Sequence, residues 1–196
     1  MKRTVGPLGS LVGVLAVLGV ATPAAAHPAP FSFVDVRVQA TSIDVEVVLH
    51  VFDVAYELGL QPPDRVLDPA ALGPRAGRLA ALLLDRLHIS VDGRLQTVET
   101  WANPEPLPER QSVSLRGRVD LGRAPGVVDV AAVLFPYDPA HQTFVNFYDD
   151  GELNAQAILG GDETSHEYFV GSRQGTLAVI QKFVPQGVRH ILIGPD

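Results

Sequence analysis

Two side chains suited to divalent metal ions, His190 and Asp196, lie in the apolar segment 183–196 at the end of the chain. An imidazole nitrogen and a carboxylate oxygen are both common ligands of such ions. Most other residues of the segment are Val, Ile, Leu, Gly and Pro, as in the opening of a transmembrane helix. Ionisable side chains are costly inside a bilayer and usually have a function there. The sequence therefore predicts that His190 and Asp196 bind or pass a divalent metal ion. Hydrogen bonding between helices is the alternative.

A third candidate ligand, His27, depends on how the N-terminus is processed. The chain begins with basic residues, continues with an apolar run at 11–20 and has three alanines ending at Ala26, which is typical of a secretory signal. The apolar run is about half as long as a spanning helix, which favours a cleaved leader over an uncleaved anchor. Cleavage after Ala26 gives His27 a free α-amine beside its imidazole, a chelating pair for Cu(II) or Ni(II). His50 or Asp53, expected on a nearby strand, would be a third ligand. A frayed terminus without metal is the alternative.

The apolar segment also carries residues at a recognisable spacing: Gly187, His190, Ile191, Gly194 and Asp196. This order resembles the HupE/UreJ family of bacterial membrane proteins, in which a Gly-x-x-His-Ile-x-x-Gly-x-Asp-His motif lies in an early transmembrane helix. The arrangement of leader, β-rich domain and motif is also similar to the longer members of that family. The resemblance implies nickel as the ion, because the family is associated with nickel supply to hydrogenase and urease. It also implies that the chain is the exported domain and first membrane residues of a longer protein.

The residues between the leader and this motif have patterns that predict mainly β structure. Apolar and polar residues alternate at 34–38 and again at 43–51, which predicts an antiparallel pair of strands with one solvent-exposed face. Further strands are expected at 88–91, 95–101, 113–121, 127–135, 143–148 and 153–158. Strands of this number and length, separated by turn signals, predict an immunoglobulin-like antiparallel sandwich.

One amphipathic helix is expected as an insertion in this sandwich, with Pro74 in its first turn. Apolar residues follow at the spacing of a single helical stripe: Ala76, Leu79, Ala80, Leu83, Leu84 and Leu87. Such a stripe predicts a helix that packs on the sheet of its own domain. Binding of a partner by this stripe is the alternative.

The composition changes again near Gly171, where a polar linker leads into apolar residues at helical spacing. We therefore expect a signal peptide at 1–26, an exported β-rich domain at 27–170, and at 171–196 a linker with a C-terminal helical segment leading to the membrane. This organisation predicts an exported protein at the cell membrane, with the 27–170 domain on the extracytoplasmic side.

Composition and motifs argue against several functions. The formal net charge is −7, which argues against nucleic acid as a partner. There is no cysteine, so neither disulfides nor thiolate ligands are available. The chain has no Gly-x-Ser-x-Gly elbow, no phosphate-binding glycine loop and no His-Glu-x-x-His, and we expect no enzymatic activity.

Other acidic and histidine residues are weaker candidates for binding an ion. The cluster of Asp149, Asp150 and Glu152 has the ligand type of a hard cation site, but the Asp-Gly turn of a hairpin explains it better. Asp138 and His141 form half a metal site at most, so a loop-capping role is expected. The remaining histidines are expected at the surface or in hydrogen bonds: His50, His88 and His166.

Two functions remain after these observations. The first is the exported domain of a HupE/UreJ-like membrane protein linked to nickel uptake or supply. The second is a soluble exported metal-binding or interaction module without transport activity, whose C-terminal segment folds back onto the domain. The first is favoured, because an intramembrane-type His and Asp are hard to explain in a core without partners.

Overall fold

The computed structural model describes residues 31–171, so His27, His190 and Asp196 lie outside the described residues. The expected leader and the expected C-terminal helical segment lie outside them as well. Within 31–171 no helix is long and apolar enough to cross a membrane.

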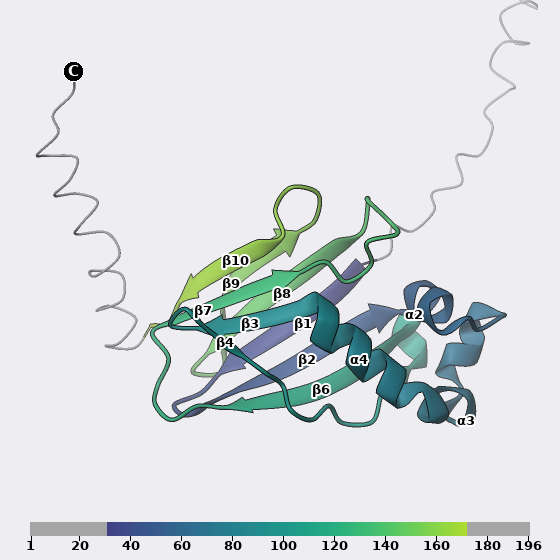
Figure 1. Cartoon of the computed structure of the whole chain (residues 1–196), viewed down its shortest axis with the longest axis horizontal. Helices are drawn as coiled ribbons and strands as arrows, with labels where there is room; N and C mark the ends of the chain where they lie inside the picture. The colour runs from purple at the N-terminus through teal and green to yellow at the C-terminus, as the bar shows by residue number, and fades with distance from the viewer. Residues whose placement is uncertain (1–30, 172–196) are drawn as a thin grey trace, which may run out of the picture.

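Residues 31–171 form two β-sheets that face each other, so the expected mainly β class is confirmed (Figure 1). One sheet has six strands in the order β5-β6-β2-β1-β8-β9, and the other has four in the order β10-β7-β3-β4. The strands are β1 (Phe31–Val38), β2 (Ser42–His50), β3 (Leu87–Val91), β4 (Arg94–Gln96), β5 (Glu105–Leu107), β6 (Ser112–Asp120), β7 (Val127–Ala132), β8 (Gln142–Asp149), β9 (Glu152–Leu159) and β10 (Ser165–Phe169).

The first two strands form the expected antiparallel pair, with Val34 opposite Val47 and Val36 opposite Val45. Their alternating valines are buried, and their polar residues lie on the outer face, where Arg37 pairs with carboxylates of the same face. β1 also pairs along its whole length with β8, in parallel. The first strand of the described domain is therefore an interior strand of its sheet.

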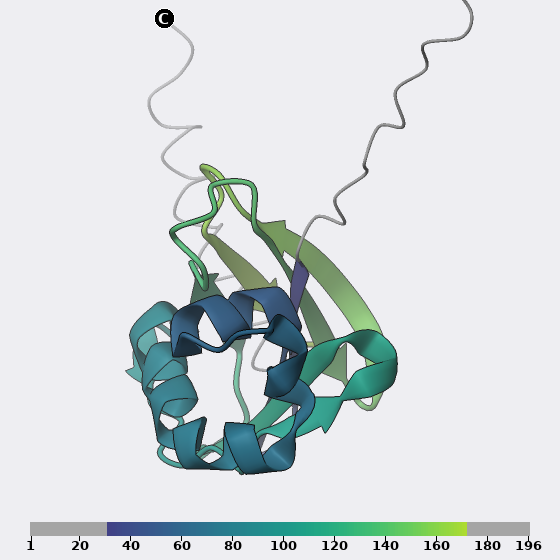
Figure 2. The same cartoon turned by 90° about the vertical axis from the view of Figure 1, so that its right-hand side faces the viewer.

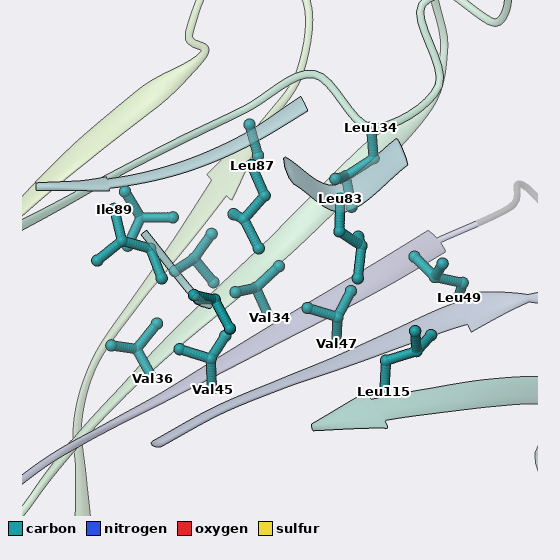
Figure 3. Close-up of a cluster of buried hydrophobic side chains, with 14 of the residues drawn as sticks. Val34, Val36, Val45, Val47, Leu49, Leu83, Leu87, Ile89, Leu115 and Leu134 are labelled. Atoms are coloured by element: carbon teal, nitrogen blue, oxygen red, sulfur yellow. The ribbon is translucent and has the colours of Figure 1, made fainter. Parts of the chain in front are cut away.

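The apolar core fills the space between the two sheets (Figure 3). The six-stranded sheet contributes alternate residues of its central strands, while β3 and the last helix before it contribute from the other side. Labelled members of this core are Val34, Val36, Val45, Val47, Leu49, Leu83, Leu87, Ile89, Leu115 and Leu134.

A helical segment joins β2 to β3 and lies across one end of the sandwich (Figures 1 and 2). It contains α2 (Val51–Leu58), η1 (Pro63–Leu67), α3 (Pro69–Leu72), η2 (Gly73–Arg75) and α4 (Ala76–Arg86). The expected amphipathic helix is α4, which buries Leu79 and Leu83. The predicted insertion is therefore present but is only the last part of this segment.

Helix α2 corrects the prediction that the second strand continues to Val51. The His50 side chain caps the helix by accepting a hydrogen bond from the Phe52 N–H at 3.4 Å. The apolar residues 51, 54, 55 and 58 are buried, and their spacing is that of a helix. The sequence did not predict this helix because the strand-like alternation continues to Val51. Asp53 therefore lies in the first turn of a helix and not on a strand.

Several strand boundaries also differ from the prediction. β4 ends at Gln96, after which the chain crosses to the edge of β6 and forms an isolated bridge between Trp101 and Gly117. A Cβ atom on Gly117 would collide with the side chains of Val98 and Trp101, so glycine makes this close approach feasible. β5 lies within the expected Pro-rich link, β7 ends at Ala132, and β10 was not predicted.

Candidate functional site

The most unusual polar group of the described domain is a buried carboxylate facing a buried imidazole, Asp53 and His141. Asp53 belongs to the first turn of α2, and His141 directly precedes β8. The two are 2% and 7% exposed. They meet because the end of β2, where α2 begins, lies near the start of β8 in the same sheet.

A short loop sets the position of His141. The Asp138 side chain accepts a hydrogen bond from the Ala140 N–H at 3.0 Å, and the His141 N–H donates to the Asp138 carbonyl at 3.1 Å. The expected loop-capping role of Asp138 is thus confirmed. The His141 ring packs edge-on against Phe135, with ring centroids 4.8 Å apart. The two hydrogen bonds hold the loop at His141, and the contact with Phe135 orients the His141 ring.

Three further contacts define the geometry of the pair. His141 Nε2 lies 3.1 Å from the hydroxyl oxygen of Ser32 on β1. The Tyr137 hydroxyl donates to Asp53 Oδ1 at 2.6 Å. His141 Nδ1 and Asp53 Oδ2 are 3.7 Å apart.

The two facing atoms, His141 Nδ1 and Asp53 Oδ2, are buried and have no hydrogen-bond partner among the described residues. Buried polar atoms without a partner are rare and costly. When Nε2–H donates to Ser32, Nδ1 directs a lone pair toward a carboxylate oxygen, which is repulsive unless a proton or cation lies between them. The position between the two atoms is therefore suited to a cation or a proton.

Burial governs the protonation of this site. Burial raises the pKa of the Asp53 carboxyl, although the hydrogen bond from Tyr137 and the attraction of His141 oppose this shift. Burial lowers the pKa of the His141 imidazole, opposed by the charge of Asp53. Burial and the hydrogen bond to Asp53 raise the pKa of the Tyr137 hydroxyl, so it remains a donor. His141 is thus a neutral imidazole near pH 7, which is the form that binds metals.

A cavity of about 220 Å³ borders His141. Its wall is mostly apolar and comes from the chain after β7 and the loop after β9, including Phe135, Pro139 and Leu159. Asp138, Thr143 and Thr164 contribute polar groups. The cavity is large enough for several water molecules or a hydrated ion, and it provides an approach to the buried ring.

In space, the hydroxyl of Ser32, the imidazole of His141 and the carboxylate of Asp53 follow one another as in a Ser-His-Asp catalytic triad. However, Ser32 is 0% exposed, so its hydroxyl cannot reach a substrate carbonyl in this conformation. The hydroxyl instead serves as the hydrogen-bond partner that orients the imidazole.

The sequence prediction did not find this pair, because Asp53 and His141 are far apart in the sequence and Asp53 was expected on a strand. The only signal was an Asp three residues after His50 in an apolar run. His50 lies close enough to act electrostatically on both members of the pair, but its Nδ1 is used to cap α2. Within residues 31–171 no group of three or more His, Cys, Asp or Glu is arranged to hold a metal ion.

The acidic hairpin tip has the conformation of the predicted turn, with positive φ at Asp150 (53°) and Gly151 (81°). Asp149 accepts a hydrogen bond from the Gly171 N–H at 2.9 Å and lies 3.5 Å from the Tyr168 hydroxyl. Its carboxylate is therefore used to hold the end of the described domain.

Compared with known proteins, the chain matches no family model and shows no significant similarity to a curated protein.

Proposed function

We propose that the chain is the extracytoplasmic domain and first membrane residues of a HupE/UreJ-like membrane protein that takes part in supplying a divalent metal ion. The motif residues from Gly187 to Asp196 support the membrane part of this proposal. Nickel is the ion that the resemblance implies. The same proposal places the 27–170 domain outside the cytoplasm and assigns it no enzymatic activity.

The observation that carries the metal part of the proposal is the unpartnered pair of Asp53 Oδ2 and His141 Nδ1. Bonds from a divalent ion to imidazole nitrogen and carboxylate oxygen are about 2.0–2.2 Å long. One ion between the two atoms is compatible with their separation of 3.7 Å. With two protein ligands, water molecules would complete the coordination of the ion. Binding by so few protein ligands is weak and reversible, and delivery of an ion requires reversible binding.

The test is titration of the purified chain with Ni(II) by calorimetry near pH 7.5. We expect Asp53→Asn and His141→Gln to remove one binding site. Asp64→Asn and His88→Gln, which change exposed residues of the same types, should leave it intact. A chain with one extra residue before His27 separates this site from the N-terminal chelate. Identical titrations for all variants would refute a metal site at Asp53 and His141.

Whether the domain belongs to a membrane protein is a separate question. The coding sequence beyond codon 196 decides it, since further apolar spans of about twenty residues are expected. Replacing His190 with Ala in the full-length protein should reduce uptake of radioactive nickel at equal expression. Unchanged uptake would rule out transport through His190.

A soluble exported interaction module is the second candidate function. Leu153 and Ile158 on β9, 54% and 48% exposed, favour it because large apolar side chains gathered on one strand often mark a binding surface. In this case the coding sequence would end without further apolar spans.

We also infer that the sandwich is of the immunoglobulin-like class. Strands β1 to β7 can be lettered in chain order as A, B, C, C′, D, E and F. In these letters β5-β6-β2-β1 is D-E-B-A and β7-β3-β4 is F-C-C′, which is the strand order of an immunoglobulin-like sandwich. β8 and β9 extend the first sheet, and β10 takes the place beside β7. A solved structure superposed on immunoglobulin-like domains would test this class.

A further inference from the structure

The outer edge of β9 is the longest strand edge of the described domain that has no partner. Among residues 31–171, β9 pairs only with β8, and it ends the six-stranded sheet (Figure 1). The other edge strands are shorter: β4 and β5 have three residues each and β10 has five. β9 has eight.

The sequence of β9 lacks the residues that usually prevent edge strands from pairing. Natural edge strands are protected by proline, by inward or central charges, especially lysine, or by a β-bulge. β9 reads Glu-Leu-Asn-Ala-Gln-Ala-Ile-Leu, with no proline and with its only charge on the first residue. Edge strand β5, by contrast, contains Pro106 and begins with Glu105. Of these features β9 has only a bulge, at Asn154, and the backbone of residues 155–159 is open to another strand.

A β-bulge places two exposed apolar side chains of β9 on the same face. Leu153 and Ile158 are five positions apart, which would put them on opposite faces of a regular strand. The bulge adds one residue between the pairs Phe147–Ala155 and Tyr148–Leu153. Leu153 therefore lies on the outer face with Tyr148, as Ile158 does with Phe144.

With the bulge taken into account, residues 153–158 of β9 are arranged symmetrically about Gln156. Ala155 and Ala157 flank it on the inner face, and Leu153 and Ile158 follow on the outer face. A strand with this symmetry is complementary to its own copy in antiparallel orientation. Two-fold symmetry would place Gln156 opposite Gln156 of the second copy, Ala155 opposite Ala157, and Leu153 opposite Ile158.

The charges fit the same arrangement. Glu152 of each copy would lie at opposite ends of the paired strands, so the two like charges are kept apart. Cross-strand pairs of apolar side chains such as Leu and Ile stabilise antiparallel strands.

We propose that β9 is a dimerisation edge, at which two copies of this chain pair antiparallel about Gln156 and join their six-stranded sheets into one. This interface is independent of the proposed metal site.

The chain has no cysteine, which allows a direct test by cross-linking of the full chain. Residues directly opposite in an antiparallel pair have Cα atoms about 4.5–5.5 Å apart, which is within the disulfide range of about 4.4–6.8 Å. We expect Gln156→Cys to form a disulfide-linked dimer on mild oxidation with diamide. Leu95→Cys, at a 63% exposed position on another edge strand, should not.

Equal amounts of dimer in the two variants would mean random collision and would overturn the proposal. No dimer in either would also overturn it and would mean that another segment or partner covers the edge.

A second measurement does not depend on oxidation. Sedimentation of the chain over a range of concentrations should show a monomer–dimer equilibrium. Gln156→Lys should weaken it severalfold, because like charges directly opposite on paired strands are destabilising. Leu95→Lys adds the same charge elsewhere and should have no effect. Circular dichroism of both variants checks that the fold is intact, and a chain that is monomeric throughout would overturn the proposal.

Discussion

At the scale of single residues, the Asp53 carboxylate is buried and only partly satisfied by hydrogen bonds. It is buried in the first turn of α2, where the helix dipole favours a negative charge. It accepts one hydrogen bond, from Tyr137, and faces His141 without a hydrogen bond. The carboxylate therefore depends strongly on the hydroxyl of Tyr137.

Replacing Tyr137 with Phe should destabilise the domain by about 1–3 kcal/mol, because Asp53 Oδ1 loses its donor while remaining buried. Urea denaturation measures this free energy of unfolding. Tyr56→Phe is the matched control, since Tyr56 is 63% exposed and stacks on Tyr137 with ring centroids 3.9 Å apart. Equal destabilisation by both changes would contradict the prediction.

His141 should make the stability of the domain sensitive to mild acid. Its folded-state pKa lies below the unfolded value of 6.5, so the folded state resists protonation and loses stability as the pH falls below 6.5. The raised pKa of Asp53 acts in the opposite direction, because the folded chain then takes up a proton more readily than the unfolded one.

We expect the unfolding free energy to fall as the pH drops below 6.5, with a slope of at most about 1.4 kcal/mol per pH unit from this group. In His141→Gln this slope should be smaller, whatever the absolute stability of the variant. Denaturation curves at several pH values measure both slopes. Parallel profiles would show that His141 does not titrate in this way.

At the scale of elements, the segment that crosses from β4 to β5 depends on Gly117. Gly117→Ala would push its new methyl group into Val98 and Trp101 and should cost about 1–3 kcal/mol through displacement of the segment. Trp101 is the only tryptophan, so its fluorescence reports the change directly. Gly122→Ala is the control, because a Cβ there has no atom within 4 Å. An unchanged spectrum in Gly117→Ala would show that the segment is not held at this point.

The elements differ in how far the sequence could predict them. β1, most of β2 and α4 follow from apolar periodicity, because each buries one face against the core. β5 and β10 are short edge strands whose formation depends on neighbours distant in sequence. Helix α2 was not predicted because Val51 continues the strand alternation. The His50 cap and the burial of one face of α2 against the core stabilise the helix instead.

The candidate site was less predictable than the fold for a related reason. The loop with Asp138 and His141 could be recognised, but the partner of His141 could not. That partner is set by the pairing of β1 with β8 and by the start of α2. The strand pairing leaves no local signal in the sequence, and the alternation up to Val51 conceals the start of α2.

At the scale of the whole molecule, the buried apolar core lies between Val34 and Val170. We therefore expect residues 27–171 to fold on their own with a cooperative thermal transition. Val170 is 5% exposed and its N–H donates to the Gly126 carbonyl, so a chain that ends at Tyr168 should melt at a lower temperature. Calorimetry of both lengths tests this. A broad, non-cooperative transition for 27–171 would contradict the expectation.

The parallel pairing of β1 with β8 has a consequence for the export that we propose. β1 is the first strand to leave the ribosome and, under the proposed export, a translocation channel, but its neighbour β8 follows only after residue 141. The Phe31–Phe144 ring contact forms only then. Pairing between strands so distant in sequence is slow. The six-stranded sheet therefore cannot close before β8 has been made, which would suit the threading of the chain through a narrow channel under the proposed export. A variant whose sheet closed earlier would be expected to block its own export.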